Sequence, residues 1–214
     1  MRNIYSSESG ETCMFWDKVG ACRHGSKCAK YHLKPKKSKT VIFWKIFNNP
    51  VRTYFSKNYN NANNEQDADT NTRTGVFKKN EVIINDDDLN AEATRLFKDL
   101  FVELATKYGE IDSILICGNF NTHIGGNVLV KFKDEKVAAK CVVECNDRWY
   151  NGKPIFCELS TVTHFEDAIC KEFNTKNTCA RGDQCNLIHQ RKIDPELRRS
   201  IFASQKAYLK EKDV

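Results

Sequence analysis

A chain of 214 residues has room for one ordinary domain with small satellites, or for a single larger domain. Its hydrophobic content of 40% and charged content of 29% exclude wholesale disorder, and no apolar run approaches the roughly 18 residues of a membrane span. The net charge of +6 is uneven, because residues 1–39 carry nine Lys or Arg against three Asp or Glu, residues 40–159 fifteen against seventeen, and residues 160–214 ten against eight. We therefore expect a folded nuclear or cytosolic protein whose basic ends contact polyanions.

The first feature in chain order is a set of cysteines and a histidine with metal-ligand spacing. The pattern C-x8-C-x5-C-x3-H begins at residue 13, and the same spacing returns unchanged at residue 170. In a reducing compartment the ten cysteines are unlikely to pair as disulfides, so those clustered with histidines are better explained as metal ligands, and zinc favours four tetrahedral sulfur and nitrogen ligands. The sequence therefore predicts two zinc fingers with two Zn²⁺ ions. The expected ligands are Cys13, Cys22, Cys28 and His32, then Cys170, Cys179, Cys185 and His189.

Aromatic and basic side chains lie between these ligands, a combination typical of proteins that bind single-stranded nucleic acid. The second finger has fewer of them, with Phe173 in place of Phe15 and Leu187 near the position of Tyr31. The alternative is that one or two rings of the set, which includes Trp16, only cover the zinc. The candidate RNA contacts are Phe15, Arg23, Lys27, Lys30 and Tyr31 in the first finger, and Phe173 and Arg181 in the second.

Between the fingers, hydrophobic patterns predict a central α+β domain. Residues 41–47 indicate a strand, and residues 56–75, rich in Asn, Asp and Thr, indicate a disordered loop. Apolar positions at helical spacing predict a helix from Leu89 to Tyr108, with Asp86 to Asp88 before its start. Strands at 111–117, 126–132 and 154–159 and a helix at 134–145, capped by Asp134, complete the order β-α-β-β-α-β. This order is that of an RNA recognition motif.

The third strand departs from the RNA-binding signature, because Asn127 and Leu129 stand where aromatic rings would stack bases. The sheet is therefore expected to be a poor RNA platform. A tryptophan in a turn beside an arginine is instead a typical anchor for a protein partner, unless it packs on its own domain. Two carboxylates one helical turn apart could add an acidic face. The candidate partner-binding residues are Asp99, Glu103, Arg148, Trp149 and Tyr150.

The other four cysteines, Cys117, Cys141, Cys145 and Cys157, lie in apolar stretches without ligand spacing, so we expect them in the core. Four protein ligands leave no open position on either zinc, and no nucleophile–base pair or phosphate loop is visible. An enzyme is therefore not expected. The predicted parts are a finger at residues 1–39, the central domain at 40–160, a finger at 161–192 and a basic helix at 193–214.

The order of these parts resembles the small subunit of the U-two snRNP auxiliary factor of pre-mRNA splicing. The resemblance covers nearly the whole chain and is carried by the paired arrays, by Arg148-Trp149-Tyr150-Asn151-Gly152, and by Asp194-Pro195-Glu196-Leu197-Arg198-Arg199. It implies a nuclear splicing factor whose two fingers bind the AG dinucleotide of the 3′ splice site in single-stranded pre-mRNA. It also implies a heterodimer, in which the central domain grips a tryptophan-bearing segment of the large subunit.

The resemblance assigns roles to single residues. Arg148 and Tyr150 would frame the partner's tryptophan, Asp99 and Glu103 would hold basic residues around it, and Trp149 would insert into the large subunit. Contacts with RNA would fall to Phe15, Arg23, Lys30 and Arg181. Tyr150 stands where the family has Phe, and its hydroxyl needs a partner or solvent. Ala29 stands where relatives often carry a serine near the RNA.

Two other readings remain open. A regulator with tandem fingers could bind AU-rich messenger RNA, although such fingers usually lie next to each other and a whole domain separates these two. A protein adaptor could use the fingers as structural units only, with binding confined to the central domain. The aromatic and basic residues of the first finger argue against the adaptor.

Overall fold

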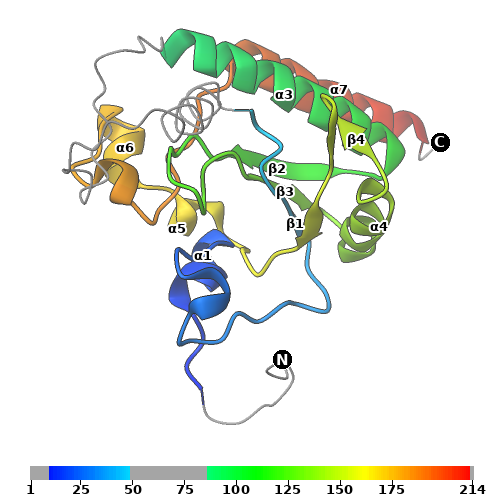
Figure 1. Cartoon of the computed structure of the whole chain (residues 1–214). Helices are drawn as coiled ribbons and strands as arrows, with labels where there is room; N and C mark the ends of the chain where they lie inside the picture. Colours follow the sequence, from blue (N-terminus) through cyan, green and yellow to red (C-terminus); the bar gives the residue numbers. More distant parts are fainter. Residues whose placement is uncertain (1–9, 49–85, 213–214) are drawn as a thin grey trace.

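The computed structural model describes residues 10–48 and 86–212, and the loop expected at 56–75 lies outside these residues. A four-stranded antiparallel sheet forms its centre, in the order β2-β3-β1-β6 (Figure 1). Strand β1 (Thr40–Phe43) lies between β3 (Val128–Phe132) and β6 (Cys157–Leu159), and β2 (Ile111–Ile116) pairs with the other side of β3. Helices α3 (Asp86–Lys107) and α4 (Glu135–Cys145) complete the predicted order, which confirms the α+β class. None of the described helices is long and apolar enough to cross a membrane.

Helices α3 and α4 cover one face of the sheet. Alternate strand residues, among them Val41, Phe43 and Val130, point into a core that also holds the apolar stripe of α3. Asp86 to Asp88 form the first turn of α3 and do not precede it, and their carboxylates favour the positive end of the helix dipole there. The predicted cap of α4 is confirmed, because the Asp134 side chain accepts a hydrogen bond from the backbone N–H of Lys136 at 2.8 Å.

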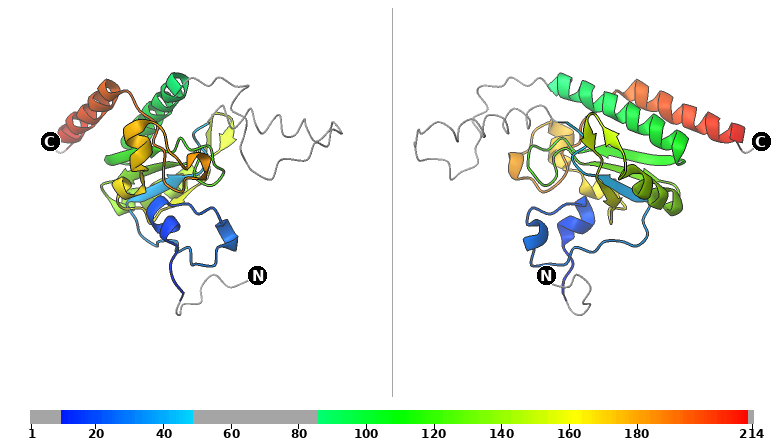
Figure 2. Two further views of the ribbon diagram at one scale, coloured as in Figure 1. Left: turned by 90° about the vertical axis from the view of Figure 1, so that its left-hand side faces the viewer. Right: turned by 45° about the vertical axis from the view of Figure 1, so that its right-hand side comes forward.

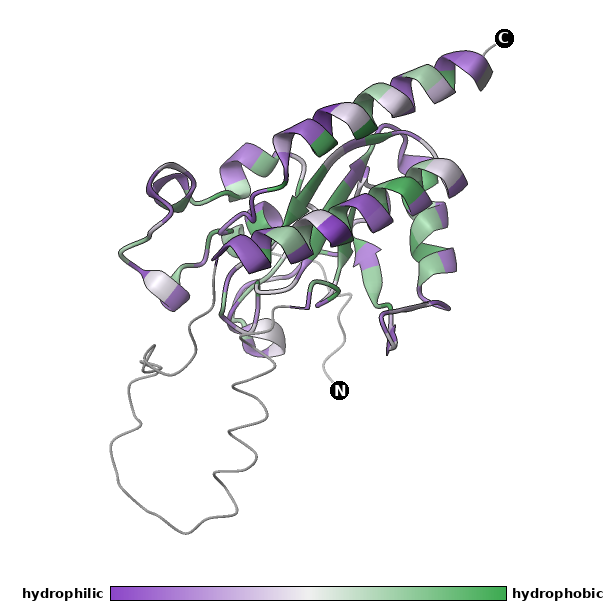
Figure 3. Cartoon of the chain, turned by 90° about the horizontal axis from the view of Figure 1, so that it is seen from above, coloured by the Kyte–Doolittle hydropathy of each residue, from purple (hydrophilic) through white to green (hydrophobic). Residues whose placement is uncertain are grey.

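A second long helix, α7 (Pro195–Lys212), packs beside α3, as two further views also show (Figure 2). The rings of Phe101 and Phe202 meet edge to face with centroids 4.8 Å apart. The buried amide of Gln205 donates to the carbonyl of Ile111 and accepts from its N–H, both at 2.9 Å. From above, the strands are largely green, whereas α3 and α7 mix green and purple, as amphipathic surface helices do (Figure 3). The chain after the second finger thus joins the packing of the sheet domain.

The two fingers cover the opposite face of the sheet. Ile42, Leu115 and Leu129, one from each of three adjacent strands, are buried in a second apolar cluster. The fingers and the segment between β6 and the second finger supply its other side with Val19, Ala21, Val162, Phe165, Ala168 and Ile188. Strands buried on both faces read as continuous apolar runs, which explains the runs Val41–Phe43, Ile114–Ile116 and Val128–Val130 within β1, β2 and β3. The face on which an RNA recognition motif stacks bases is therefore closed by the protein itself.

Strands β2 and β3 match the prediction to within two residues, and the first and last predicted strands differ more. Strand β1 ends at Phe43 because the chain turns at Trp44 and Lys45, and Lys45 has a φ of 56° that no strand residue adopts. The strand expected at 154–159 is divided in two. Its start, β5 (Lys153–Pro154), pairs with β4 (Trp149–Tyr150) in a separate hairpin, and only β6 joins the main sheet.

Candidate functional site

The first Cys-His array folds as a short helix and a tight loop around its four side chains. Cys13 precedes helix α1 (Met14–Val19), which ends at Gly20 with a φ of 75°. A 3-10 turn at Gly25–Lys27 then leads into Cys28. The glycine is needed here, because this left-handed conformation is costly for other residues and because the site of its missing Cβ is crowded by neighbouring side chains.

The second array repeats this structure element by element. Helix α6 (Lys171–Lys176) follows Cys170 and ends at Asn177 with a φ of 59°, and a 3-10 turn at Gly182–Gln184 leads into Cys185. Asparagine is one of the few other residues that adopt the left-handed conformation readily. In each finger one bridge joins the segment before the first ligand to the segment before the histidine, Thr12 to Tyr31 and Ile169 to Ile188. Equal spacing has produced equal folds.

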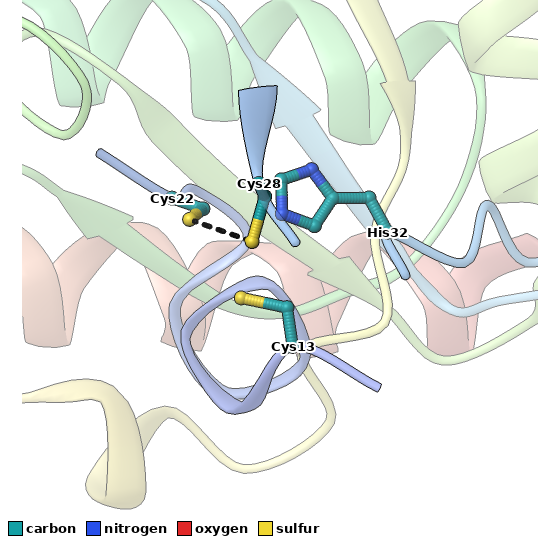
Figure 4. Close-up of side chains that lie close together, drawn as sticks. All are labelled: Cys13, Cys22, Cys28 and His32. Atoms are coloured by element: carbon teal, nitrogen blue, oxygen red, sulfur yellow. Dashed lines mark hydrogen bonds between the residues drawn. The ribbon is translucent and has the colours of Figure 1, made fainter. Parts of the chain in front are cut away.

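The predicted ligands converge in both fingers. In each array one sulfur or nitrogen atom per residue lies within 4.8 Å of all the others. The sulfur atoms of Cys22 and Cys28 are 3.8 Å apart, as are those of Cys170 and Cys179 (Figure 4 shows the first array). A tetrahedral zinc ion with bonds of about 2.3 Å to sulfur places its ligands roughly 3.8 Å apart. Each cluster could therefore hold one metal ion.

The two histidines support this assignment. Nε2 of His32 and Nε2 of His189 are buried, and neither has a hydrogen-bond partner among the described residues. A buried nitrogen without a partner is costly, and a metal ion would satisfy it. Burial lowers the pKa of His32. Burial, followed by the charges of Arg191 and Arg181, lowers the pKa of His189 to about 4. Both rings are thus kept neutral, which is the form that binds a metal.

One aromatic ring in each finger stacks on the ligand histidine. Trp16 lies parallel to His32 at 4.5 Å between centroids, and Phe173 lies parallel to His189 at 4.1 Å. Phe173 therefore corresponds to Trp16, and the expected equivalence with Phe15 is wrong; the residue at the position of Phe15 is Glu172. Likewise Ile188, and not Leu187, occupies the position of Tyr31. Trp16 and Phe173 thus each cover one face of a candidate ligand histidine.

The two fingers contact each other directly. Nε of Arg23 donates to the side-chain oxygen of Asn186 at 2.9 Å, and a terminal nitrogen of Arg23 donates to the carbonyl of Gln184 at 2.7 Å. Nε2 of His123 lies 3.2 Å from the same oxygen of Asn186. The arrays are far apart in sequence, yet the guanidinium of Arg23 in the first finger hydrogen-bonds to the residues on either side of Cys185 in the second. A single ligand could therefore meet both fingers.

Sequence reasoning missed the loop that positions the second finger. The amide of Asn119 donates to the carbonyl of Leu187 at 2.9 Å and accepts from the N–H of His189 at 2.8 Å. Asn121 donates to the carbonyl of Cys185 at 3.0 Å. The loop lies between β2 and β3, and its only sequence signal is a run of Asn and Gly residues between two strands. These hydrogen bonds tie the finger to the central sheet.

All five predicted partner-binding residues line one pocket of about 390 Å³ between α3 and the β4–β5 hairpin. The hairpin turns at Asn151 and Gly152, both with positive φ, as an Asn-Gly turn requires. A terminal nitrogen of Arg148 lies 2.7 Å from a carboxylate oxygen of Glu103, and the hydroxyl of Tyr150 donates to Asp99 at 2.9 Å. Trp149 is 69% exposed, so it does not pack on its own domain.

Comparison with known proteins identifies the family of this chain. No protein-family model matches it. It is 34% identical to the splicing factor U2AF 26 kDa subunit of Bos taurus over 203 residues, which are 94% of this chain and 83% of that protein. It is 32% identical to the U2AF 23 kDa subunit of Schizosaccharomyces pombe over 98% of this chain and 85% of that protein. It is 33% identical to the U2af 38 kDa subunit of Drosophila melanogaster over 96% of this chain and 71% of that protein. With both Cys-His clusters in place, the chain belongs to the family of small subunits of the splicing factor U2AF.

Proposed function

We propose that this chain is a nuclear splicing factor subunit that recognises the AG dinucleotide of the 3′ splice site with two zinc-loaded fingers. In this proposal each Cys-Cys-Cys-His cluster holds one Zn²⁺, and residues 1–39 and 161–192 bind pre-mRNA. Residues 40–160 bind the large subunit, and the basic helix at 193–214 supports them. The observation that carries the proposal is the contact of Arg23 with Asn186 and Gln184, because it joins both fingers into one surface.

The side chains proposed for RNA are accessible to solvent. Arg23, Lys27, Lys30, Tyr31 and Arg181 are exposed, and Phe15 and Phe173 are half-buried. Lys30 is paired with Glu11 at 2.8 Å, but an exposed ion pair contributes little and can be exchanged for a phosphate. Zinc in such a site is structural, since its four ligands come from the protein. In this proposal, aromatic and basic side chains of the chain contact the RNA, and the zinc ions only stabilise the fold that positions these side chains.

The pocket is proposed as the site of the large subunit's tryptophan. Glu103 already orients Arg148, so the guanidinium plane is set before the partner arrives. Tyr150 offers the second flat surface, and the exposed Trp149 is free to insert into the partner. Asp99 is occupied by the Tyr150 hydroxyl, so a basic residue of the partner would share this carboxylate.

Fluorescence anisotropy with short RNAs at one fixed salt concentration tests the proposal. Zinc-loaded chain, with and without the large subunit, is titrated with RNA that contains a pyrimidine-AG junction and with RNA in which AG is changed. Tight binding that is lost on changing AG, and weakened by Arg181→Ala, is expected. Lys140→Ala on α4 removes the same charge away from the fingers and is the matched control. Binding indifferent to AG would contradict splice-site recognition, and no binding at all would favour the adaptor with structural fingers.

A further inference from the structure

A cluster of buried sulfur atoms lies beneath the pocket and has no part in the function proposed above. Cys141 and Cys145 stand one turn apart on α4 with their sulfur atoms 3.7 Å apart. The sulfur of Cys145 lies 3.6 Å from the hydroxyl of Tyr108. Cys157 on β6 packs against the same helix, with its sulfur 3.8 Å from the carbonyl of Val142. All three cysteines are buried, as expected from the sequence, but two of their thiols are in direct contact.

The three thiols differ in access and in protonation. Cys145 is a lining residue of the pocket, whereas Cys141 and Cys157 are not, so Cys145 is the nearest of the three to a small molecule that enters the pocket. Hydrogen bonds from Cys141 and then Cys157 hold the pKa of Cys145 well below its usual range. The same contact with Cys145, followed by burial, raises the pKa of Cys141. The thiol beside the pocket therefore lies in contact with a second thiol that favours its ionised form.

We propose that Cys145 and Cys141 form an oxidation site that hydrogen peroxide or a similar small peroxide converts to a disulfide. The Cys145 thiolate attacks a peroxide oxygen, the O–O bond breaks, and a sulfenic acid and hydroxide are formed. The Cys141 sulfur then attacks the Cys145 sulfur and displaces the sulfenic oxygen, which leaves as water with the proton of Cys141. The two cysteines together lose two electrons, and these reduce the peroxide to water.

The bond requires the last turn of α4 to shift. Residues four positions apart in an α-helix have Cβ atoms about 5–6 Å apart, whereas a disulfide spans roughly 3.5–4.5 Å between Cβ atoms. The sulfur atoms are already 3.7 Å apart, and Cys145 is the last residue of α4, so its backbone can move toward Cys141 while the earlier turns stay helical.

Oxidation should alter the pocket, an effect that rests on the proposed function. The new bond draws the Cys145 sulfur toward Cys141 and away from the Tyr108 hydroxyl. That hydroxyl also interacts with Arg148, which Glu103 orients. The disulfide would therefore change both the wall of the pocket and the support of Arg148. Loss of one such hydrogen bond corresponds to about a fivefold weaker affinity for the partner's tryptophan.

Peptide mass spectrometry provides a direct test. Zinc-loaded full-length chain is treated with hydrogen peroxide, alkylated with iodoacetamide and digested with trypsin. Cleavage after Lys140 and Arg148 releases residues 141–148, which carry both cysteines and exclude Cys157. This peptide is expected to lose two hydrogens and to resist alkylation while both zinc ions stay bound. Full alkylation at doses that already release zinc would overturn the proposal, as would a crosslink to the peptide of Cys157.

Two variants separate the steps. Cys141→Ala should stop at the sulfenic acid of Cys145, which dimedone traps, and Cys157→Ala should still form the disulfide. If Cys157→Ala abolished the disulfide, the assigned pair would be wrong.

Binding of a peptide with one tryptophan among basic residues is then compared for reduced and oxidised chain. A disulfide without any change in affinity would refute the link to the pocket. Failure of the reduced chain to bind the peptide would count against the proposed function and leave the oxidation result unaffected.

Discussion

At the scale of single residues, the hydroxyl of Tyr150 shows how one atom changes a binding site. Phenylalanine at this position would offer the same ring, but the hydroxyl takes one oxygen of Asp99 at 2.9 Å. The carboxylate that the resemblance assigns to the partner's basic residues is thus already engaged within the chain. Tyr150→Phe would release the carboxylate of Asp99 and keep the aromatic ring, with little loss of apolar packing.

Burial and then the hydrogen bond to Asp99 raise the pKa of Tyr150 to about 12. Because an unfolded tyrosine titrates near pH ~10, the folded state favours the protonated hydroxyl, and this stability is present below pH ~10 and lost as pH rises toward 12. Titration of phenolate absorbance should show a late-titrating tyrosine that Tyr150→Phe lacks. The same number of groups titrating late in both proteins would contradict the assignment.

The ligand residues make a second prediction at this scale. Cys22→Ala and Cys179→Ala should each reduce the bound zinc from two ions to one, because three protein ligands do not close a structural tetrahedral site. Cys117→Ala removes a buried sulfur outside both arrays and should retain two. Metal analysis of the purified proteins decides this. Two ions in Cys179→Ala would show that the second cluster is not the metal site proposed.

At the scale of elements, one buried amide connects α7 to the edge of the sheet. Gln205 is the only described side chain that hydrogen-bonds both backbone groups of Ile111, where β2 begins. Gln205→Ala would leave two buried polar groups without a partner, which costs about 1–3 kcal/mol for each such group. Urea unfolding should therefore show a loss of at least about 1 kcal/mol. Ser204→Ala, at an exposed neighbour on the same helix, is the control and should change the free energy of unfolding little. If both variants lost the same stability, the loss would come from the helix and not from the hydrogen bonds to Ile111.

At the scale of the whole molecule, the central domain is a scaffold that brings two remote fingers together. Both fingers bury apolar side chains on one sheet face, and Arg23 connects them through hydrogen bonds to Asn186 and Gln184. The loop that contains Asn119 and Asn121 fixes the second finger through hydrogen bonds to its backbone. In the proposed function the sheet would therefore contribute to RNA binding by positioning the fingers, because its own face is covered by them.

Arg23→Ala should loosen this arrangement without loss of zinc, since Arg23 is not a ligand. Hydrogen exchange at the backbone of residues 184–186 is expected to accelerate, and affinity for RNA should fall by more than in Lys27→Ala, which removes a cation from the same finger. Faster exchange without weaker RNA binding would mean that the contact only stabilises the fold. An equal loss of affinity in both variants would assign Arg23 a simple phosphate contact.

The sequence by itself determined what depends on local spacing. Periodicity and side-chain chemistry act directly between residues close together in the chain. They account for the two Cys-Cys-Cys-His clusters, the helix that contains Leu89, the cap at Asp134 and the Asn-Gly turn. Only the tertiary structure decided what depends on distant contacts. Among these are the burial of Leu129 under the fingers, the stacking of Phe173 on His189 and the contact between Arg23 and Asn186. Packing selects such contacts among many of similar local energy, so no short sequence window contains them.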